Sequence, residues 1–192
     1  MPGGAEVELS MLFADIRGST TLAENMSTLA FSQLISSFFA TSTDVLVRRR
    51  AWIDRLVGDQ VIGLFVPGFA GQEHARLAVR AAQEMLHAMG HADSEGPWVP
   101  VGIGVHTEKA FVGAVGRQDR ATDITVLGDA PNIAARLSSA AAAGEILFSA
   151  SAAQAAFAAS DIMDGLQRRQ LSLKGKSEPV AVYVLRDYDP LP

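Results

Sequence analysis

Apolar and polar positions follow patterns along the chain that predict where its helices lie. Over residues 28–49, apolar side chains return every three or four positions, which is the spacing of an amphipathic helix. Residues 71–90 are rich in alanine and end in a glycine, which predicts a second helix. Residues 129–142 predict a third, with Asp129 as its N-cap and Pro131 in its first turn. An alanine-dense segment near residues 150–160 predicts a fourth.

Short apolar runs between these helices predict strands. Residues 11–14 form one run, and residues 51–65 contain two that flank Gly58 and Asp59, a pair typical of a tight hairpin turn. Residues 99–116 predict two strands, residues 122–128 and 145–149 one each, and residues 168–185 two more. Helices that alternate with hairpins predict an α+β fold, in which helices pack on one face of a sheet.

Composition and charge narrow the class of protein. The chain has 192 residues, of which 48% are hydrophobic, and this is enough for the core of one domain. A net charge of -5 argues against a broad basic surface, so we expect no nucleic-acid partner. The absence of cysteine excludes disulfides, thiolate metal ligands and a cysteine nucleophile.

No apolar run reaches the roughly 20 residues that span a bilayer. Residues 1–10 lack the basic start and apolar centre of a signal peptide. We therefore expect no membrane span in this chain and a cytoplasmic location.

Two carboxylates follow the first predicted strands. Asp15 ends the first strand and Asp59 lies in the next hairpin turn, and sequential strands are usually neighbours. Both side chains are therefore expected at one sheet edge, where carboxylates and substrate phosphates together suit Mg²⁺. The turn at Gly18, Ser19 and Thr20 would offer backbone N–H groups to the same phosphates. These residues alone leave an alternative open, in which Asp15 caps a helix and Asp59 is an ordinary turn residue.

A polar pair lies on the helix predicted at residues 129–142. Asn132 and Arg136 are four positions apart, so they share one helical face. Arginine supplies a forked cation and asparagine a neutral donor, a combination that suits an anionic transition state. A solvent-exposed polar face is the alternative.

Five segments, taken in order, resemble the successive motifs of class III nucleotidyl cyclase catalytic domains: LFADIRGSTTLAE, RLVGDQVIGLF, VGIGVHTEKAFVGAVG, DITVLGDAPNIAARL and LSLKGKSEPVAVYVL. The resemblance implies a ferredoxin-like palm domain with an antiparallel sheet at residues 9–187, with short tails at 1–8 and 188–192. It also implies a head-to-tail homodimer that converts a nucleoside triphosphate into the 3′,5′-cyclic monophosphate and pyrophosphate.

The resemblance assigns roles to the metal and transition-state residues. Asp15 and Asp59 match the two metal-binding aspartates, and the Ile16 carbonyl matches a further ligand of two Mg²⁺ or Mn²⁺ ions. Asn132 and Arg136 match the residues that orient the ribose and stabilise the pentavalent phosphorus.

The resemblance also bears on the substrate. Asp123 matches the position that reads the adenine amino group in adenylyl cyclases, so ATP is the implied substrate. Lys174 matches a phosphate-contacting lysine, with Lys176 close enough to compete. One departure from the family pattern is Arg55, which stands where the family has an adenine-reading lysine. The planar, forked guanidinium need not bond a ring nitrogen as lysine does, which bears on purine choice and turnover.

Three alternatives to an adenylate cyclase follow. Arg55 is compatible with relaxed purine selectivity, or with a nucleotide-binding regulatory module that has lost turnover. A non-catalytic interaction domain would leave the coincidence of Asp15, Asp59, Asn132 and Arg136 unexplained. The four residues together favour an active adenylate cyclase, whose regulatory partner the sequence does not identify.

Overall fold

The structure is a computed structural model that describes residues 3–115, 123–157, 166–172 and 179–186. Its strands are β1 (Gly4–Ile16), β2 (Trp52–Val57), β3 (Gln60–Phe65), β4 (Val101–Val115), β5 (Asp123–Leu127), β6 (Ile146–Ser149), β7 (Gln167–Leu171) and β8 (Val180–Leu185). Its helices are α1 (Ser19–Asn25), α2 (Thr28–Arg48), α3 (Pro67–Ala70), α4 (His74–Ala88), α5 (Ala130–Ala140) and α6 (Ala150–Ala156). None of these helices is both long and apolar enough to cross a membrane.

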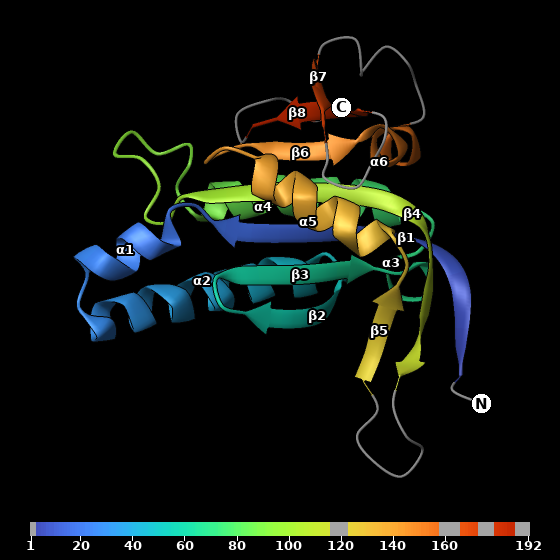
Figure 1. Ribbon diagram of the computed structural model, residues 1–192, viewed down its shortest axis with the longest axis horizontal. Coiled ribbons are helices and arrows are strands. Elements are labelled where there is room, and N and C mark those ends of the chain that lie inside the picture. The colour runs from blue at the N-terminus through green and yellow to red at the C-terminus, as the bar shows by residue number, and fades with distance from the viewer. Residues whose placement is uncertain (1–2, 116–122, 158–165, 173–178, 187–192) are drawn as a thin grey trace.

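The strands form one mixed sheet in the order β2-β3-β1-β4-β6-β8-β7, with β5 paired to β4 beyond this path (Figure 1). Neighbouring strands in the described sheet run antiparallel except β4 and β6, which are parallel. The predicted α+β fold with helices packed on a sheet is confirmed, while the sheet is mixed and not wholly antiparallel, because β4 and β6 are joined through α5, which crosses over the sheet between them.

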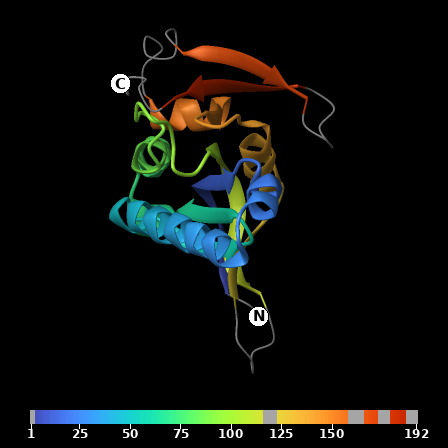
Figure 2. The same ribbon diagram turned by 90° about the vertical axis from the view of Figure 1, so that its left-hand side faces the viewer.

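Helices cover both faces of this sheet (Figure 2). Met11 and Phe13 of β1 pack in the cluster that contains α5 residues. Leu12 and Ala14 point the opposite way, into the larger core shared with α2, α4 and α6. The prediction that helices pack on one face is wrong, because a central strand with apolar side chains on both sides needs a layer on each.

β4 (Val101–Val115) is a single long strand where two strands were predicted over residues 99–116. β4 pairs with β1 without interruption from Val101, opposite Ile16, to Gly113, opposite Gly4. The exposed, charged Glu108 and Lys109 interrupt the apolar pattern, but pairing with β1 continues through them. β1 is longer than the apolar run 11–14 for the same reason.

The predicted long helices and the hairpin are confirmed as α2, α4, α5 and β2–β3, and α6 lies in the alanine-dense segment. Two short helices, α1 and α3, were not predicted. α1 has no buried residue, so it carries no apolar period that the sequence could reveal.

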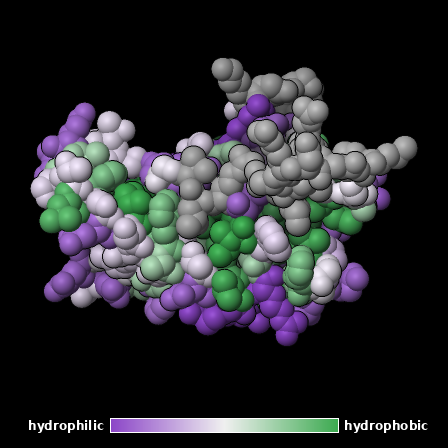
Figure 3. All heavy atoms as spheres, turned by 90° about the horizontal axis from the view of Figure 1, so that it is seen from below, coloured by the Kyte–Doolittle hydropathy of each residue, from purple (hydrophilic) through white to green (hydrophobic). Residues whose placement is uncertain are grey.

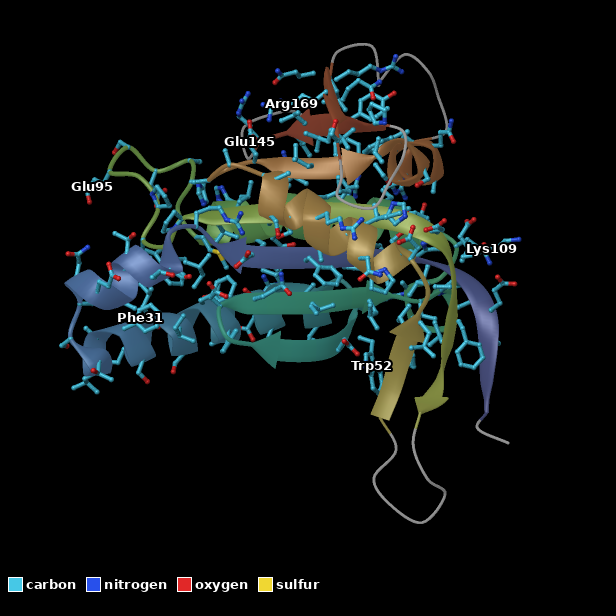
Figure 4. The ribbon with its side chains drawn as sticks, viewed as in Figure 1. Phe31, Trp52, Glu95, Lys109, Glu145 and Arg169 are labelled. Atoms are coloured by element: carbon cyan, nitrogen blue, oxygen red, sulfur yellow. The ribbon has the colours of Figure 1, made fainter. Side chains whose placement is uncertain are left out.

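A carboxylate network ties the C-terminal strands to the loop that follows α5. The Glu145 side chain is only 7% exposed and accepts hydrogen bonds from Arg169 at 2.6 and 2.9 Å and from Arg186 at 3.1 Å (Figure 4). The Arg169 hydrogen bonds hold the pKa of Glu145 below its usual range, against the opposing effect of burial. This network fixes β7 and β8 beside the end of α5.

A second polar cluster lies inside the core. The buried Ser10 hydroxyl is 2.9 Å from His74 Nδ1 and 2.6 Å from the Thr107 hydroxyl. Burial lowers the pKa of His74, while the charge of Glu8 acts weakly in the opposite direction. The folded protein therefore holds this imidazole neutral under conditions in which an exposed histidine begins to protonate.

We expect the free energy of unfolding to fall as the pH drops below about 6.5, the usual histidine pKa. In that range the unfolded chain binds a proton at His74 and the folded protein does not, so acid favours unfolding. His74→Gln should flatten this slope in urea unfolding series, and should lower stability at pH 7 by about 1–3 kcal/mol through the lost buried hydrogen bond. His87→Gln, at the exposed end of the same helix, is the matched control for the loss of a histidine side chain from α4. An unchanged slope in His74→Gln would contradict this account.

Candidate active site

Asp15 lies at the C-terminal end of β1. Strand alternation places it on the same face as Phe13, the face that α5 covers. β1 pairs with β3 so that Asp15 is opposite Gln60, which brings the β2–β3 turn to the same end. There the Ile16 N–H donates to the Asp59 carbonyl at 3.1 Å. The structure therefore brings Asp15, Ile16 and Asp59 together at one sheet edge.

The two carboxylates interact electrostatically. Burial raises the pKa of Asp15, the ion pair with Arg17 opposes this, and the negative charge of Asp59 raises it further. A repulsion between two carboxylates is relieved when a cation binds between them. The pair therefore has the charge of a divalent-cation site.

The number of ligands indicates which kind of metal site this is. In the described part of the chain, no group of three or more acidic, histidine or cysteine side chains could hold a metal ion. Mg²⁺ is usually bound by one or two carboxylates together with waters and substrate phosphates. Asp15 and Asp59 therefore fit an ion whose other ligands are waters or substrate phosphates, and do not form an all-protein cage.

The turn after β1 leads directly into α1. Gly18 precedes the helix with φ 68°, a left-handed conformation that favours glycine. The first N–H groups of a helix have no partner within it, and those of Ser19 and Thr20 lie in this first turn. Gly18 and Thr20 are exposed and Ser19 is half-buried, so the turn is open to a ligand beside Asp15.

Asn132 lies in the first turn of α5, at a cleft of about 240 Å³. α5 covers β1 and β4 but leaves part of β3 and β2 open on this face. Residues of β1, β2, β3, β5 and α5 line the cleft: Met11, Phe13, Asp54, Ile62, Leu64, Val126, Pro131, Asn132 and Ala135. Asp54 was missed by the sequence analysis, in which the neighbouring Arg55 drew attention.

α5 itself is seated closely on β4. A Cβ atom at Gly104 would lie 2.3 Å from the backbone nitrogen of Ser138, so only glycine permits this approach. The C-terminal end of α5 reaches the metal-pair edge, where Arg17 donates to the Ser138 and Ser139 carbonyls at 3.2 Å. At about 1.5 Å per residue, Asn132 lies about 9 Å before Ser138 along the helix axis.

The remaining predicted residues are placed less completely. Arg136 is half-buried on α5, one turn after Asn132. Arg55 lies in β2, where it pairs with Ile62 of β3, and Asp123 starts β5, where it pairs with Val115 of β4. Of Arg55 and Asp123, only the backbone lies within the described structure. Lys174 lies outside the described residues, as does Lys176.

Two carboxylates at one sheet edge, beside an open turn at the start of a helix, suit a metal-dependent enzyme that acts on nucleotides. Residues 4–187 match the family model described as the adenylate and guanylate cyclase catalytic domain, and the chain belongs to this family of class III cyclases.

Solved structures agree with this assignment. The guanylyl cyclase Cya2 superimposes with a TM-score of 0.83 at 26% identity, over 95% of this chain and 93% of that one. The adenylyl cyclase CyaB from P. aeruginosa superimposes with a TM-score of 0.81 at 29% identity, over 97% of both chains.

An adenylate cyclase of Anabaena cylindrica is 27% identical over 184 residues, which are 93% of this chain but 36% of that protein. The chain thus spans about a third of the length of this curated relative. Catalytic domains of this family function as dimers, bind a nucleotide substrate and use two divalent metal ions.

Proposed function

We propose that this domain is an adenylate cyclase, which converts ATP to 3′,5′-cyclic AMP and pyrophosphate at sites shared across a head-to-tail homodimer. The observation that carries the proposal is the pair of carboxylates, Asp15 and Asp59, at one sheet edge beside an open glycine turn. Membership of the cyclase family supplies the reaction class.

The chain's own residues have distinct parts in this reaction. Asp15 and Asp59, with the Ile16 carbonyl, would hold two divalent ions, which supply Lewis-acid activation of the ribose 3′-hydroxyl and of the α-phosphate. The N–H groups at the start of α1 would bind phosphate oxygens. The bond between the 3′-oxygen and the α-phosphorus forms as the bond to pyrophosphate breaks, and the hydroxyl proton leaves to water.

Two α5 residues would act on the reacting centre itself. Asn132 would hold the ribose so that its 3′-oxygen lies in line with the leaving group. Arg136 would donate a forked pair of N–H groups to the phosphoryl oxygens, where negative charge grows in the transition state.

A shared site is supported by the surface around the cleft. Trp52 is 40% exposed, Phe69 60% and Leu127 49%, and Trp52 and Phe69 pack together with ring centroids 5.8 Å apart. Apolar side chains also gather on the side of the molecule seen in Figure 3. Exposed aromatic and apolar groups around a binding cleft are typical of a surface that another chain covers. Such a partner would bring its own Asp15 and Asp59 to the α5 residues of this chain.

We expect the purified protein to cyclise ATP with Mn²⁺ at least about tenfold faster than GTP, measured by chromatography of the cyclic nucleotides. Asp123 can accept a hydrogen bond from the adenine amino group, whereas guanine presents a carbonyl oxygen there that would repel it. Arg55→Lys restores the family residue and should hold or raise ATP turnover.

A clear preference of the wild-type protein for GTP would contradict this base assignment while leaving the cyclase reaction intact. Arg55 is the feature that favours the second candidate, a nucleotide-binding module without turnover. That candidate requires ATP binding, seen by calorimetry, with no cyclic product from either nucleotide.

A further inference from the structure

Arg17 links the metal-pair edge to the end of α5. Its Nη2 forms an ion pair with Asp15 Oδ2, and its Nε donates to the Asp15 carbonyl at 3.3 Å. On its other side, Nη1 lies 3.2 Å from the Ser138 and Ser139 carbonyl oxygens and 3.4 Å from that of Ala141. One guanidinium therefore contacts the carboxylate and the last turn of a helix at the same time.

On the α5 side of this contact, backbone carbonyl oxygens at the C-terminal end of the helix attract a cation. The last carbonyls of a helix lack the usual partner four residues on and carry the negative end of the helix dipole. The Ser138 carbonyl accepts the N–H of Ala141 at 3.1 Å and has a second lone pair for Arg17. A guanidinium is planar and has five donors in a fixed fork, so it can serve these carbonyls and a carboxylate together. The backbone N–H of Arg17 also donates to the Pro100 carbonyl at 2.7 Å, which fixes the main chain at this point.

This arrangement differs from an ordinary surface ion pair. The side chains of Arg17 and Asp15 are each 21% exposed, whereas those of the Arg76–Glu73 pair are 39% and 61% exposed. Two long, exposed side chains gain little from pairing, because solvent screens them and they lose rotamer freedom. Arg17 is held from several directions, so its position is determined by the fold.

The ion pair uses one oxygen of the Asp15 carboxylate. Carboxylates that bind metals are commonly held by hydrogen bonds from outer-shell residues, which orient them toward the ion. The positive charge of Arg17 would oppose a nearby metal ion, but the carboxylate and the α5 carbonyls already neutralise much of it. The orienting effect is therefore expected to exceed the repulsion.

We propose that Arg17 is a positioning residue, which holds the Asp15 carboxylate in a metal-binding orientation by anchoring it to the C-terminal turn of α5. The inference rests on the proposed function, since it takes Asp15 as a metal ligand. Arg17 would affect metal binding by orienting Asp15, without contacting the substrate itself.

The experiment measures Mn²⁺ binding directly, from the loss of the free-ion electron paramagnetic resonance signal as protein is added. Five proteins are compared in full-length form: wild type, Arg17→Ala, Arg17→Lys, Asp15→Ala and Arg49→Ala. Arg49 is the matched control, because it is a partly exposed arginine that pairs with a glutamate, Glu84, at 2.7 Å. Thermal midpoints show whether each variant is folded, and Arg17→Lys decides the question if Arg17→Ala does not fold.

We expect Arg17→Ala to weaken Mn²⁺ binding by about 10- to 100-fold, the usual effect of losing an outer-shell partner. Arg17→Lys should bind Mn²⁺ with intermediate affinity, because one ammonium group cannot reach both the Asp15 carboxylate and the α5 carbonyls. Arg49→Ala should bind Mn²⁺ as tightly as the wild type does. Cyclase assays at saturating Mn²⁺ should return the Arg17 variants toward the wild-type kcat, while the Mn²⁺ concentration for half-maximal rate stays raised.

Other results would overturn the proposal in distinguishable ways. Wild-type affinity in both Arg17 variants would make Arg17 a purely structural residue. Tighter Mn²⁺ binding in those variants would show that Arg17 competes with the metal. Equal binding by wild type and Asp15→Ala would refute the metal site itself, and with it the function proposed above.

Discussion

Asp15→Ala and Asp59→Ala are each expected to reduce cyclic nucleotide formation by about a thousandfold or more, a loss at least as large as that of a key transition-state donor. The described residues contain no group of three or more acidic, histidine or cysteine side chains that could hold a metal ion, so the loss of Asp15 or Asp59 leaves a single carboxylate at this edge. One carboxylate does not replace two in charge or in orientation, and activation of the 3′-hydroxyl depends on both.

The fold is expected to survive these changes. Asp59 lies half-buried in a turn outside the core, and the raised pKa of Asp15 means that the folded state disfavours its charged form relative to the unfolded chain. Thermal midpoints should therefore stay close to the wild-type value. Asp15→Asn is a useful companion, because its amide oxygen can still accept the Arg17 hydrogen bond while the charge is lost.

Asp44→Ala is the matched control, since Asp44 is an exposed aspartate on α2 and lies in no described part of the site. It should retain full activity. Turnover within threefold of wild type in Asp15→Ala or Asp59→Ala, assayed with Mn²⁺ and ATP, would exclude the two-metal assignment.

The local features of the fold could be predicted from the sequence because they depend on neighbours in the chain. The glycine–aspartate pair at Gly58 and Asp59 predicted the hairpin, and the hairpin predicted that Asp59 would return to the end of β1. The structure brings the two carboxylates together through that pairing, with Asp15 opposite Gln60. Apolar periodicity predicted α2, alanine content with a terminal glycine predicted α4, and the start at Asp129 and Pro131 predicted α5.

Features that depend on distant pairing could not be predicted. The continuity of β4 through Glu108 and Lys109 is imposed by β1, about a hundred positions earlier, and not by local preference. The role inferred for Arg17 has the same origin. Its partner Ser138 is 121 positions away in the chain, and nothing near Arg17 in the sequence marks the carbonyls that it meets.

A mixture of two inactive variants is expected to regain activity, if the site is shared as proposed. In a head-to-tail dimer, each site takes Asp15 and Asp59 from one protomer and Asp123, Asn132 and Arg136 from the other. Asp15→Ala alone damages both sites of its homodimer, and so does Arg136→Ala. A symmetric dimer has two equivalent sites, so a mixed dimer has one site with both lesions and one with neither.

The recovery has a definite size and a strict control. When subunits exchange freely at equal amounts, about half of the dimers are mixed and each has one of two sites intact, so about a quarter of wild-type activity should return.

Asp15→Ala mixed with Asp59→Ala should stay inactive, because both changes fall in the metal half and every site of the mixed dimer keeps a lesion. Co-purification of subunits with two different affinity tags measures the exchange independently. Within one chain, Asn132 lies in the first turn of α5, about 9 Å along the helix axis before Ser138 at the Arg17 contact. A monomer with a self-contained site cannot be rescued by mixing, so exchange without recovered activity would exclude the shared site.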